Sequence, residues 1–114
     1  MIKIDEKLQG DYDTILKKIE EGILASSFSA TLEAKKDFKD IATRYSIRIF
    51  ERYSAFGKNR VTLTISLFES SNKNIEIFAV ASGGSNGIFI KVNDIGENSF
   101  IEVLEDVIKD YKNV

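Results

Sequence analysis

Apolar and polar residues alternate along the middle of the chain, and this period of two limits the possible folds more than any other feature of the sequence. The alternation runs through residues 42–53, 60–69 and 75–82, and segments 27–34 and 87–93 continue it on either side. Successive side chains of a β-strand point to opposite faces of a sheet, so this period predicts strands with one buried face.

Short runs of turn-forming residues separate these strands. They lie at 35–40, 54–59, 70–74 and 83–86. Short connections rich in Gly, Asn, Ser and Asp favour hairpins between neighbouring strands, so the strands are predicted to form an antiparallel meander. Residues 2–7 fit a short additional strand, which gives a sheet of five or six strands.

Amphipathic helices are predicted at both ends of the chain. The first has Asp11 as its N-cap, and the second begins at a capping box of Ser99 and Glu102. Their apolar stripes, spaced i, i+3, i+4, i+7, are Tyr12, Ile15, Leu16, Ile19 and Ile23, and Phe100, Val103, Leu104, Val107, Ile108 and Tyr111. Each stripe must be buried, and a sheet with one apolar face offers the surface for it.

The predicted fold class is therefore α+β, a two-layer single domain over residues 1–114. An antiparallel five- or six-stranded meander sheet carries the N-terminal and C-terminal helices on one face, in the order β-α-β5-α. The face predicted to contact the helices consists of Phe28, Ala30, Leu32, Tyr45, Ile47, Ile49, Val61, Leu63, Ile65, Leu67, Ile75, Ile77, Ala79, Ile88, Ile90 and Val92.

All four arginines of the chain lie between residues 44 and 60, and three of them recur at a spacing of four within the predicted strand 42–53. A spacing of four places these three on one strand face, which we predict to be the face opposite the helices. Guanidinium groups bind carboxylates and phosphates through paired hydrogen bonds. The candidate binding residues on this face are Arg44, Arg48, Arg52, Arg60, Phe50, Phe68 and Phe78.

Three interpretations of this face stay open. It could be a solvated face whose arginines pair with Glu33 and Glu76 across strands. It could form a homodimer by sheet-to-sheet packing, since Arg and aromatic residues are enriched at interfaces. It could also hold an anionic small molecule or an acidic protein partner between arginine clamps and phenylalanine walls. We favour a non-enzymatic binding or assembly module, with the structural homodimer as the alternative.

The chain contains no cysteine and no histidine. Disulfides, thiolate catalysis, histidine-dependent triads and cysteine-ligated metal sites are therefore excluded, and no cofactor or metal is expected. An enzyme would have to use Glu33, Glu51 or Glu76, whose spacing points to no reaction. Glu51 falls on the face assigned to the helices, where a carboxylate is either paired structurally or functional.

A glycine-rich segment, Gly83-Gly84-Ser85, follows the strand 75–82. Consecutive backbone amides in such a loop can form a small anion-binding nest. The segment matches no phosphate-loop pattern, because it lacks the Gly-Lys-Ser/Thr ending and precedes a strand. A hairpin connection that requires positive φ explains it more simply.

The charge and the apolar runs bear on partners and location. The formal net charge is −2, whereas generic nucleic-acid binding requires positive charge, so no nucleic-acid partner is expected. The first residues lack the apolar core of a secretory signal, and no apolar run approaches the roughly 20 residues of a membrane helix. We expect a soluble cytoplasmic protein that does not bind membranes.

Several short segments occur together in this chain. They are Glu51-Arg52-Tyr53-Ser54, Gly57, Asn59-Arg60-Val61, Ser82-Gly83-Gly84-Ser85 and the helix from Phe100 to Tyr111. Together they resemble a small bacterial family defined as a domain of unknown function and common in Gram-positive anaerobes. The resemblance spans nearly the whole chain. The family has no established activity, substrate or cofactor, so the resemblance implies no site residues.

Overall fold

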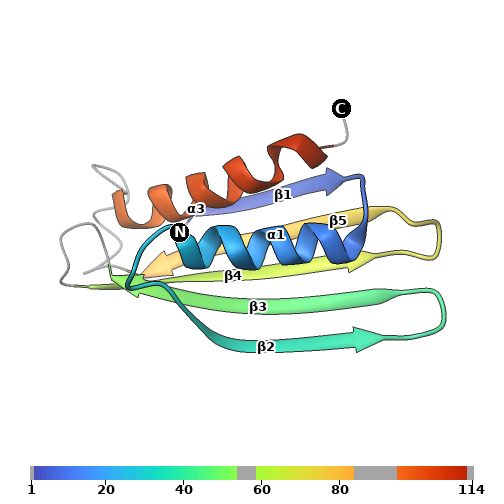
Figure 1. Ribbon diagram of the computed structural model, residues 1–114, viewed down its shortest axis with the longest axis horizontal. Helices are drawn as coiled ribbons and strands as arrows, with labels where there is room; N and C mark the ends of the chain where they lie inside the picture. The colour runs from blue at the N-terminus through green and yellow to red at the C-terminus, as the bar shows by residue number, and fades with distance from the viewer. Residues whose placement is uncertain (1, 54–58, 84–94, 113–114) are drawn as a thin grey trace.

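The computed structural model describes residues 2–53, 59–83 and 95–112, and the side chains of the last segment from residue 100 onwards. Within these residues the chain forms five strands and three helical segments (Figure 1). They are β1 (Ile2–Leu8), α1 (Tyr12–Ala25), β2 (Thr31–Lys39), β3 (Arg44–Tyr53), β4 (Arg60–Glu69), β5 (Ile75–Gly83), α3 (Ile95–Ile108) and the 3-10 helix η1 (Lys109–Tyr111).

The five strands form one antiparallel sheet in the order β1-β5-β4-β3-β2. Strands β2 to β5 follow one another as a meander, and β1 pairs with β5, so that Ile2 lies opposite Ala81 and Leu8 opposite Ile75. The two long helices lie on one side of the sheet (Figure 1). The predicted two-layer α+β class is therefore confirmed, with β1 as the additional first strand.

The helices begin and pack for identifiable reasons. Asp11 caps α1, because its Oδ2 accepts a hydrogen bond from the backbone N–H of Thr14 at 2.9 Å. Gly22 of α1 faces Val107 of α3 without a side chain between them, which lets the two helices approach closely. α3 begins at Ile95 rather than at the predicted Ser99. None of the described helices has the length and apolar character needed to span a membrane.

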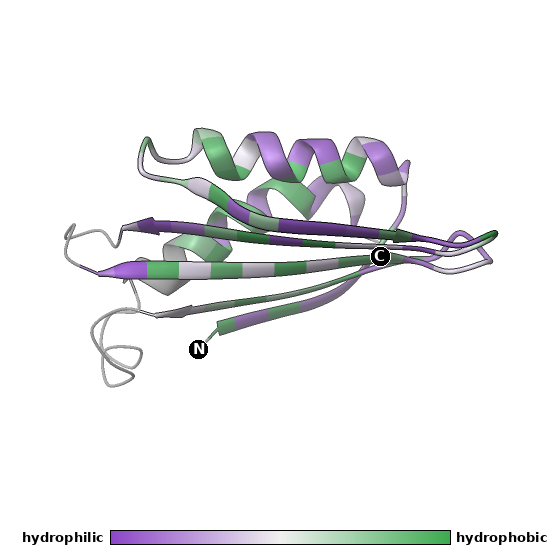
Figure 2. Cartoon of the chain, turned by 90° about the horizontal axis from the view of Figure 1, so that it is seen from below, coloured by the Kyte–Doolittle hydropathy of each residue, from purple (hydrophilic) through white to green (hydrophobic). Residues whose placement is uncertain are grey.

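The core lies between the helices and the sheet. Alternate residues of β4 and β5 point into it, and hydrophobic and hydrophilic residues alternate along these strands in Figure 2. The main buried residues are Ile4, Leu8, Tyr12, Ile15, Ile19, Ile23, Phe50, Val61, Leu63, Ile65, Leu67, Ile75, Ile77, Ala79, Ala81, Phe100, Ile101, Leu104 and Ile108. The predicted helix-facing residues of β4 and β5 are thus confirmed.

The prediction of which β3 residues face the helices is wrong. Ser46, Arg48, Phe50 and Arg52 face the helices and are almost fully buried, whereas Tyr45, Ile47 and Ile49 face the opposite side. A shift of one residue exchanges the two faces of a strand, so all the β3 assignments reverse together. The reversal occurs because long arginine side chains can lie along an apolar surface while their charged ends reach polar partners.

The prediction for β2 is displaced along the chain. The strand runs from Thr31 to Lys39 instead of 27–34, and the chain reverses at 40–43, where Asp40 N–H donates to the Thr43 carbonyl at 2.9 Å. β2 is an edge strand whose side chains are mostly exposed, and lysine is well tolerated there. Phe28, predicted to be in the core, is fully exposed. The predicted strand 87–93 lies outside the described residues.

Candidate functional site

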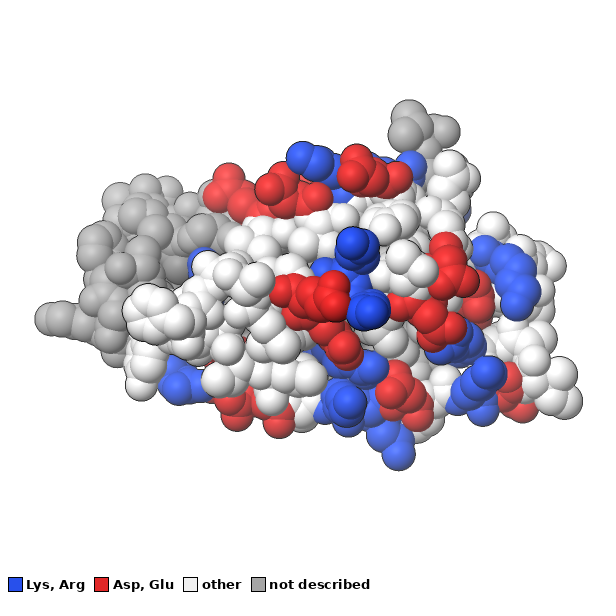
Figure 3. Space-filling model, in the orientation of Figure 1, with Lys and Arg blue, Asp and Glu red and all other residues white. Residues whose placement is uncertain are grey.

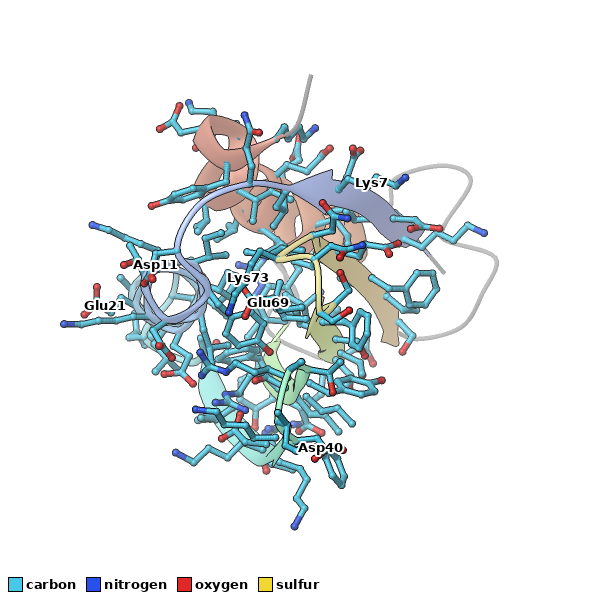
Figure 4. All side chains as sticks on the ribbon, turned by 90° about the vertical axis from the view of Figure 1, so that its right-hand side faces the viewer. Lys7, Asp11, Glu21, Asp40, Glu69 and Lys73 are labelled. Atoms are coloured by element: carbon cyan, nitrogen blue, oxygen red, sulfur yellow. The ribbon has the colours of Figure 1, made fainter. Side chains whose placement is uncertain are left out.

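The side of the sheet opposite the helices, which we call the open face, has no described element packed on it. Five described aromatic side chains on it are exposed: Phe38 by 51%, Tyr45 by 38%, Tyr53 by 47%, Phe68 by 37% and Phe78 by 44%. Figure 4 shows ring side chains projecting from the sheet on the side away from α1. Soluble proteins seldom expose so many large apolar residues together unless something binds there.

Three of these rings form a continuous row across strands. The ring centroids of Phe38 and Tyr45 are 6.0 Å apart, and those of Tyr45 and Phe68 are 6.4 Å apart in an edge-to-face arrangement. The row follows the strand register, in which Phe38 lies opposite Tyr45 and Tyr45 opposite Phe68. Half-buried Ile47, Ile49 and Val80 extend the apolar area beside the row. The apolar area therefore reaches from the middle of the open face to the end of the sheet near the connections 40–43 and 70–74, and cross-strand contacts order its rings.

A shallow hollow lies next to this row. Its volume is about 240 Å³, and it is lined by Asp5, Tyr45, Ser66, Phe68, Glu76, Ile77 and Phe78. Ile77 is fully buried on the helix side, so it contributes backbone. The side chains around the hollow are therefore three aromatic rings, two carboxylates and one hydroxyl. The Tyr45 hydroxyl forms a hydrogen bond with Ser66 Oγ at 3.3 Å.

Charged residues surround the apolar centre of the open face. The basic ones are Lys3, Lys7, Lys36 and Arg60, and the acidic ones are Asp5, Glu33, Glu51 and Glu76. Arg60 Nε donates to Glu51 Oε1 at 2.7 Å, and Glu33 lies 3.7 Å from the same guanidinium. The hydrogen bond to Glu51 raises the pKa of Arg60. Among the described residues the two signs are balanced, so this part of the rim favours neither an anionic nor a cationic macromolecule.

Arg48 lies on the helix side and is 4% exposed. It donates to Glu20 of α1, to the Ile47 carbonyl at 3.0 Å and to Asp37 of β2 at 3.3 Å. Burial would lower the pKa of Arg48, but the hydrogen bonds and charges of the two carboxylates outweigh burial and raise it. Arg48 therefore links α1, β3 and β2 through one guanidinium.

Arg44 and Arg52 lie on the same face of β3 as Arg48, with Arg44 partly exposed and Arg52 buried. Arg44 forms two hydrogen bonds with Asp13, of 2.6 and 3.0 Å, and stacks on the Tyr12 ring at 4.2 Å. The hydrogen bond from Arg44 lowers the pKa of Asp13. Arg52 is 9% exposed and lies 4.4 Å from the centroid of the Phe100 ring, and burial lowers its pKa.

The predicted site therefore divides between the two faces. Arg60, Phe68 and Phe78 lie on the open face as predicted, whereas Arg44, Arg48, Arg52 and Phe50 face the helices. On the helix side, acidic and basic side chains alternate over α1 and the strands beside it (Figure 3). The aromatic members that sequence reasoning missed are Phe38, Tyr45 and Tyr53.

A sequence signal for the arginine placement existed. Asp13 and Glu20 are seven residues apart in α1, about 10 Å along a helix, while Arg44 and Arg48 are four apart in β3, about 13 Å along a strand. The similar spans allow both pairs to form when the helix and the strand run in the same direction. This match across elements could have shown that the arginines face α1.

Two further predicted residues have structural explanations. Glu51 is predicted from the sequence to face the helices. This prediction is wrong, because Glu51 lies on the open face and pairs with Arg60. Gly83 has a φ of +112°, and a Cβ there would lie 2.5 Å from the Arg60 carbonyl oxygen. Glycine is therefore required at this position by backbone geometry. Gly84 and Ser85 lie outside the described residues.

The arrangement of the acidic side chains bears on metal ligation. Within the described residues, no group of three or more acidic side chains is arranged to hold a metal ion.

Neither the curated proteins nor the solved structures contain a significant match to this chain. A family model matches residues 1–112. With this match over nearly its whole length, the chain belongs to DUF6054, a family of unknown function.

Proposed function

We propose that this protein is a non-enzymatic assembly module that self-associates by packing the open faces of two copies against each other. The observation that carries the proposal is the exposed row Phe38, Tyr45 and Phe68 near one end of the sheet, with Phe78 beside it, on a face against which no described element packs. Face-to-face packing of two antiparallel sheets buries such rows in a layer about 10 Å thick, as in a β-sandwich.

The size of the open face suits a stable dimer. Five strands about 4.8 Å apart, each about 25 Å long, give a flat area of roughly 600 Å². Side-chain relief brings the accessible area towards the roughly 800 Å² that each partner contributes to a standard interface. An apolar, aromatic centre inside a charged rim is also the usual composition of such interfaces.

The charge pattern favours a second copy over a different partner. In a two-fold symmetric interface the same patch meets itself, so a patch of one sign would repel its copy. The described part of the rim carries basic and acidic residues in equal number, and these can pair across the two-fold axis.

The anion-binding alternative has less support from the geometry. It depended on Arg44, Arg48 and Arg52 lining the open face, and these arginines contact α1, β2 and α3 instead. Arg60 is the arginine of the open face, and Glu51 already engages it. The apolar centre is therefore the stronger basis for a function.

The test is the mass in solution of the wild type and of Phe78→Glu, measured by light scattering over a concentration series. We expect the wild type to form dimers that persist at high salt, because the centre of the interface is apolar. We expect Phe78→Glu to be monomeric, because the variant would bury an unpaired charge.

The matched control is Phe28→Glu, which makes the same change at an exposed phenylalanine in the connection between α1 and β2. This variant should still dimerise. A wild type that stays monomeric at every concentration would contradict the proposal. Dimers that survive in Phe78→Glu would also contradict it and would point to pairing of an edge strand, β1 or β2.

A further inference from the structure

We infer that the hollow on the open face is a binding site for an alkylammonium group. The hollow lies between β1, β5, β4 and β3 and places three aromatic rings beside two carboxylates. Its volume of about 240 Å³ suits a small cationic head group rather than a drug-sized molecule. The inference does not rest on self-association, because each copy carries the complete hollow.

The aromatic walls supply the first part of the recognition. Phe68 on β4 and Phe78 on β5 are diagonal neighbours, since Phe68 lies opposite Glu76 and Phe78 opposite Ser66. Tyr45 extends the wall, with its ring edge-to-face against Phe68. Ring faces carry negative electrostatic potential and attract ammonium groups, with quaternary ammonium as the best-known ligand of such walls.

The carboxylates supply the second part. Glu76 stands between Phe68 across the ladder and Phe78 two residues along β5, and Asp5 lies opposite Phe78 on β1. Both side chains are exposed. In the described part of the chain, no lysine or arginine nitrogen lies within ion-pair distance of either carboxylate. Two negative groups beside ring faces select a cation over a neutral molecule of the same shape.

A nearby lysine provides an internal check. Lys7 lies opposite Glu76 in the β1–β5 register and on the same face. Its positive charge repels an added cation and so weakens the binding of that cation at the hollow. Removing this charge as Lys7→Met should therefore strengthen the binding of an added cation.

The experiment is a titration of dilute, monomeric protein with n-butylammonium and tetramethylammonium, followed by the NMR signals of Phe68 and Phe78. We expect saturable shifts with a Kd in the millimolar range, as for one exposed cation–π site supported by carboxylates. Glu76→Gln and Phe78→Leu should each weaken binding about fivefold, and Lys7→Met should strengthen it.

Two controls keep the inference falsifiable. Glu102→Gln removes an exposed carboxylate of α3 and should leave the Kd unchanged. Neutral tert-butanol should produce no saturable shift over the same range. Equal shifts from tert-butanol, or an unchanged Kd in Glu76→Gln, would overturn the inference, whichever way the self-association experiment ends.

The ammonium group has two possible sources, and a further variant separates them. Lys36 lies on the open face of β2, away from the hollow, where its counterpart in a second copy could reach the hollow of the first. If Lys36→Met weakens self-association while butylammonium still binds, a lysine of the second copy is the ligand. If self-association is unchanged while butylammonium still binds, the ligand is a free alkylammonium compound.

Discussion

Arg48 is the clearest example of a predicted binding residue whose contacts are structural. Its side chain is nearly inaccessible, while its partners Glu20 and Asp37 are partly exposed, at 29% and 56%. The guanidinium is therefore buried under α1, and the two carboxylates remain partly exposed to solvent. From sequence alone the arginine spacing showed a shared strand face, but the choice of face depended on partners in another element.

We expect Arg48→Ala to lower the free energy of unfolding by about 2–4 kcal/mol, because it removes buried packing and the shared partner of two carboxylates. Arg60→Ala is the matched control, since Arg60 also pairs with two carboxylates but is 45% exposed. The free energy of unfolding of Arg60→Ala should stay close to that of the wild type. Urea unfolding measures both variants, and equal losses would contradict a structural role specific to Arg48.

At the scale of elements, α1 is fixed by contacts with the sheet and by contacts with α3. Its apolar stripe contacts the sheet, and its acidic residues Asp13 and Glu20 pair with β3. On its other side Gly22 allows close contact with α3. The helical stripes could be predicted from their period, but the close approach could not, because a glycine in a helix gives no indication of its neighbour.

We expect Gly22→Ala to destabilise the protein although alanine favours helices. The added Cβ would lie 2.5 Å from Val107 Cγ2, and a β-branched side chain in a helix has little freedom to move. The loss should be about 1–2 kcal/mol, as for overpacking of a core. In the double variant Gly22→Ala with Val107→Ala, thermal unfolding should show a smaller loss than the sum of the single losses. A gain in stability from Gly22→Ala alone would refute this packing account.

For the whole molecule, the acidic residues that hold α1 and β2 make stability depend on pH. Hydrogen bonds from Arg44 lower the pKa of Asp13. Burial would raise the pKa of Asp37, but hydrogen bonds from Arg48 and Ser46 outweigh it and lower the pKa. A carboxyl group with a depressed pKa binds fewer protons when folded, so its contribution is complete above the unfolded pKa of about 3.9.

We therefore expect the free energy of unfolding to fall as the pH is lowered from about 5 through the folded-state pKa values of these two groups. Urea midpoints at successive pH values measure the effect. Asp13→Asn and Asp37→Asn should each be less stable at neutral pH and should lose less on acidification. Identical pH profiles for the wild type and both variants would contradict this account.

The fold class could be predicted because it depends on periods, which the sequence displays directly. β4 and β5 alternate strictly, and their faces were assigned correctly. The predicted position of β2 was wrong because an edge strand needs no apolar face. The lysines Lys35, Lys36 and Lys39 therefore favoured the prediction of a turn. β3 was reversed because its Ile47 and Ile49 seemed more suitable for a core than arginines did. The open face could be predicted as a surface, but not the identity of all its residues.

The pairing of β1 with β5 has a consequence for the order in which the chain folds. β1 is synthesised first, but its neighbour in the sheet starts at Ile75, after α1 and three other strands. Contacts between such distant segments require closure of a long loop and slow folding. A nascent chain that ends before Ile75 can form the β2 to β4 hairpins, yet β1 waits unpaired and α1 lacks part of its sheet. β1 and β5 are therefore joined late, and the growing chain exposes apolar surface at least until β5 leaves the ribosome.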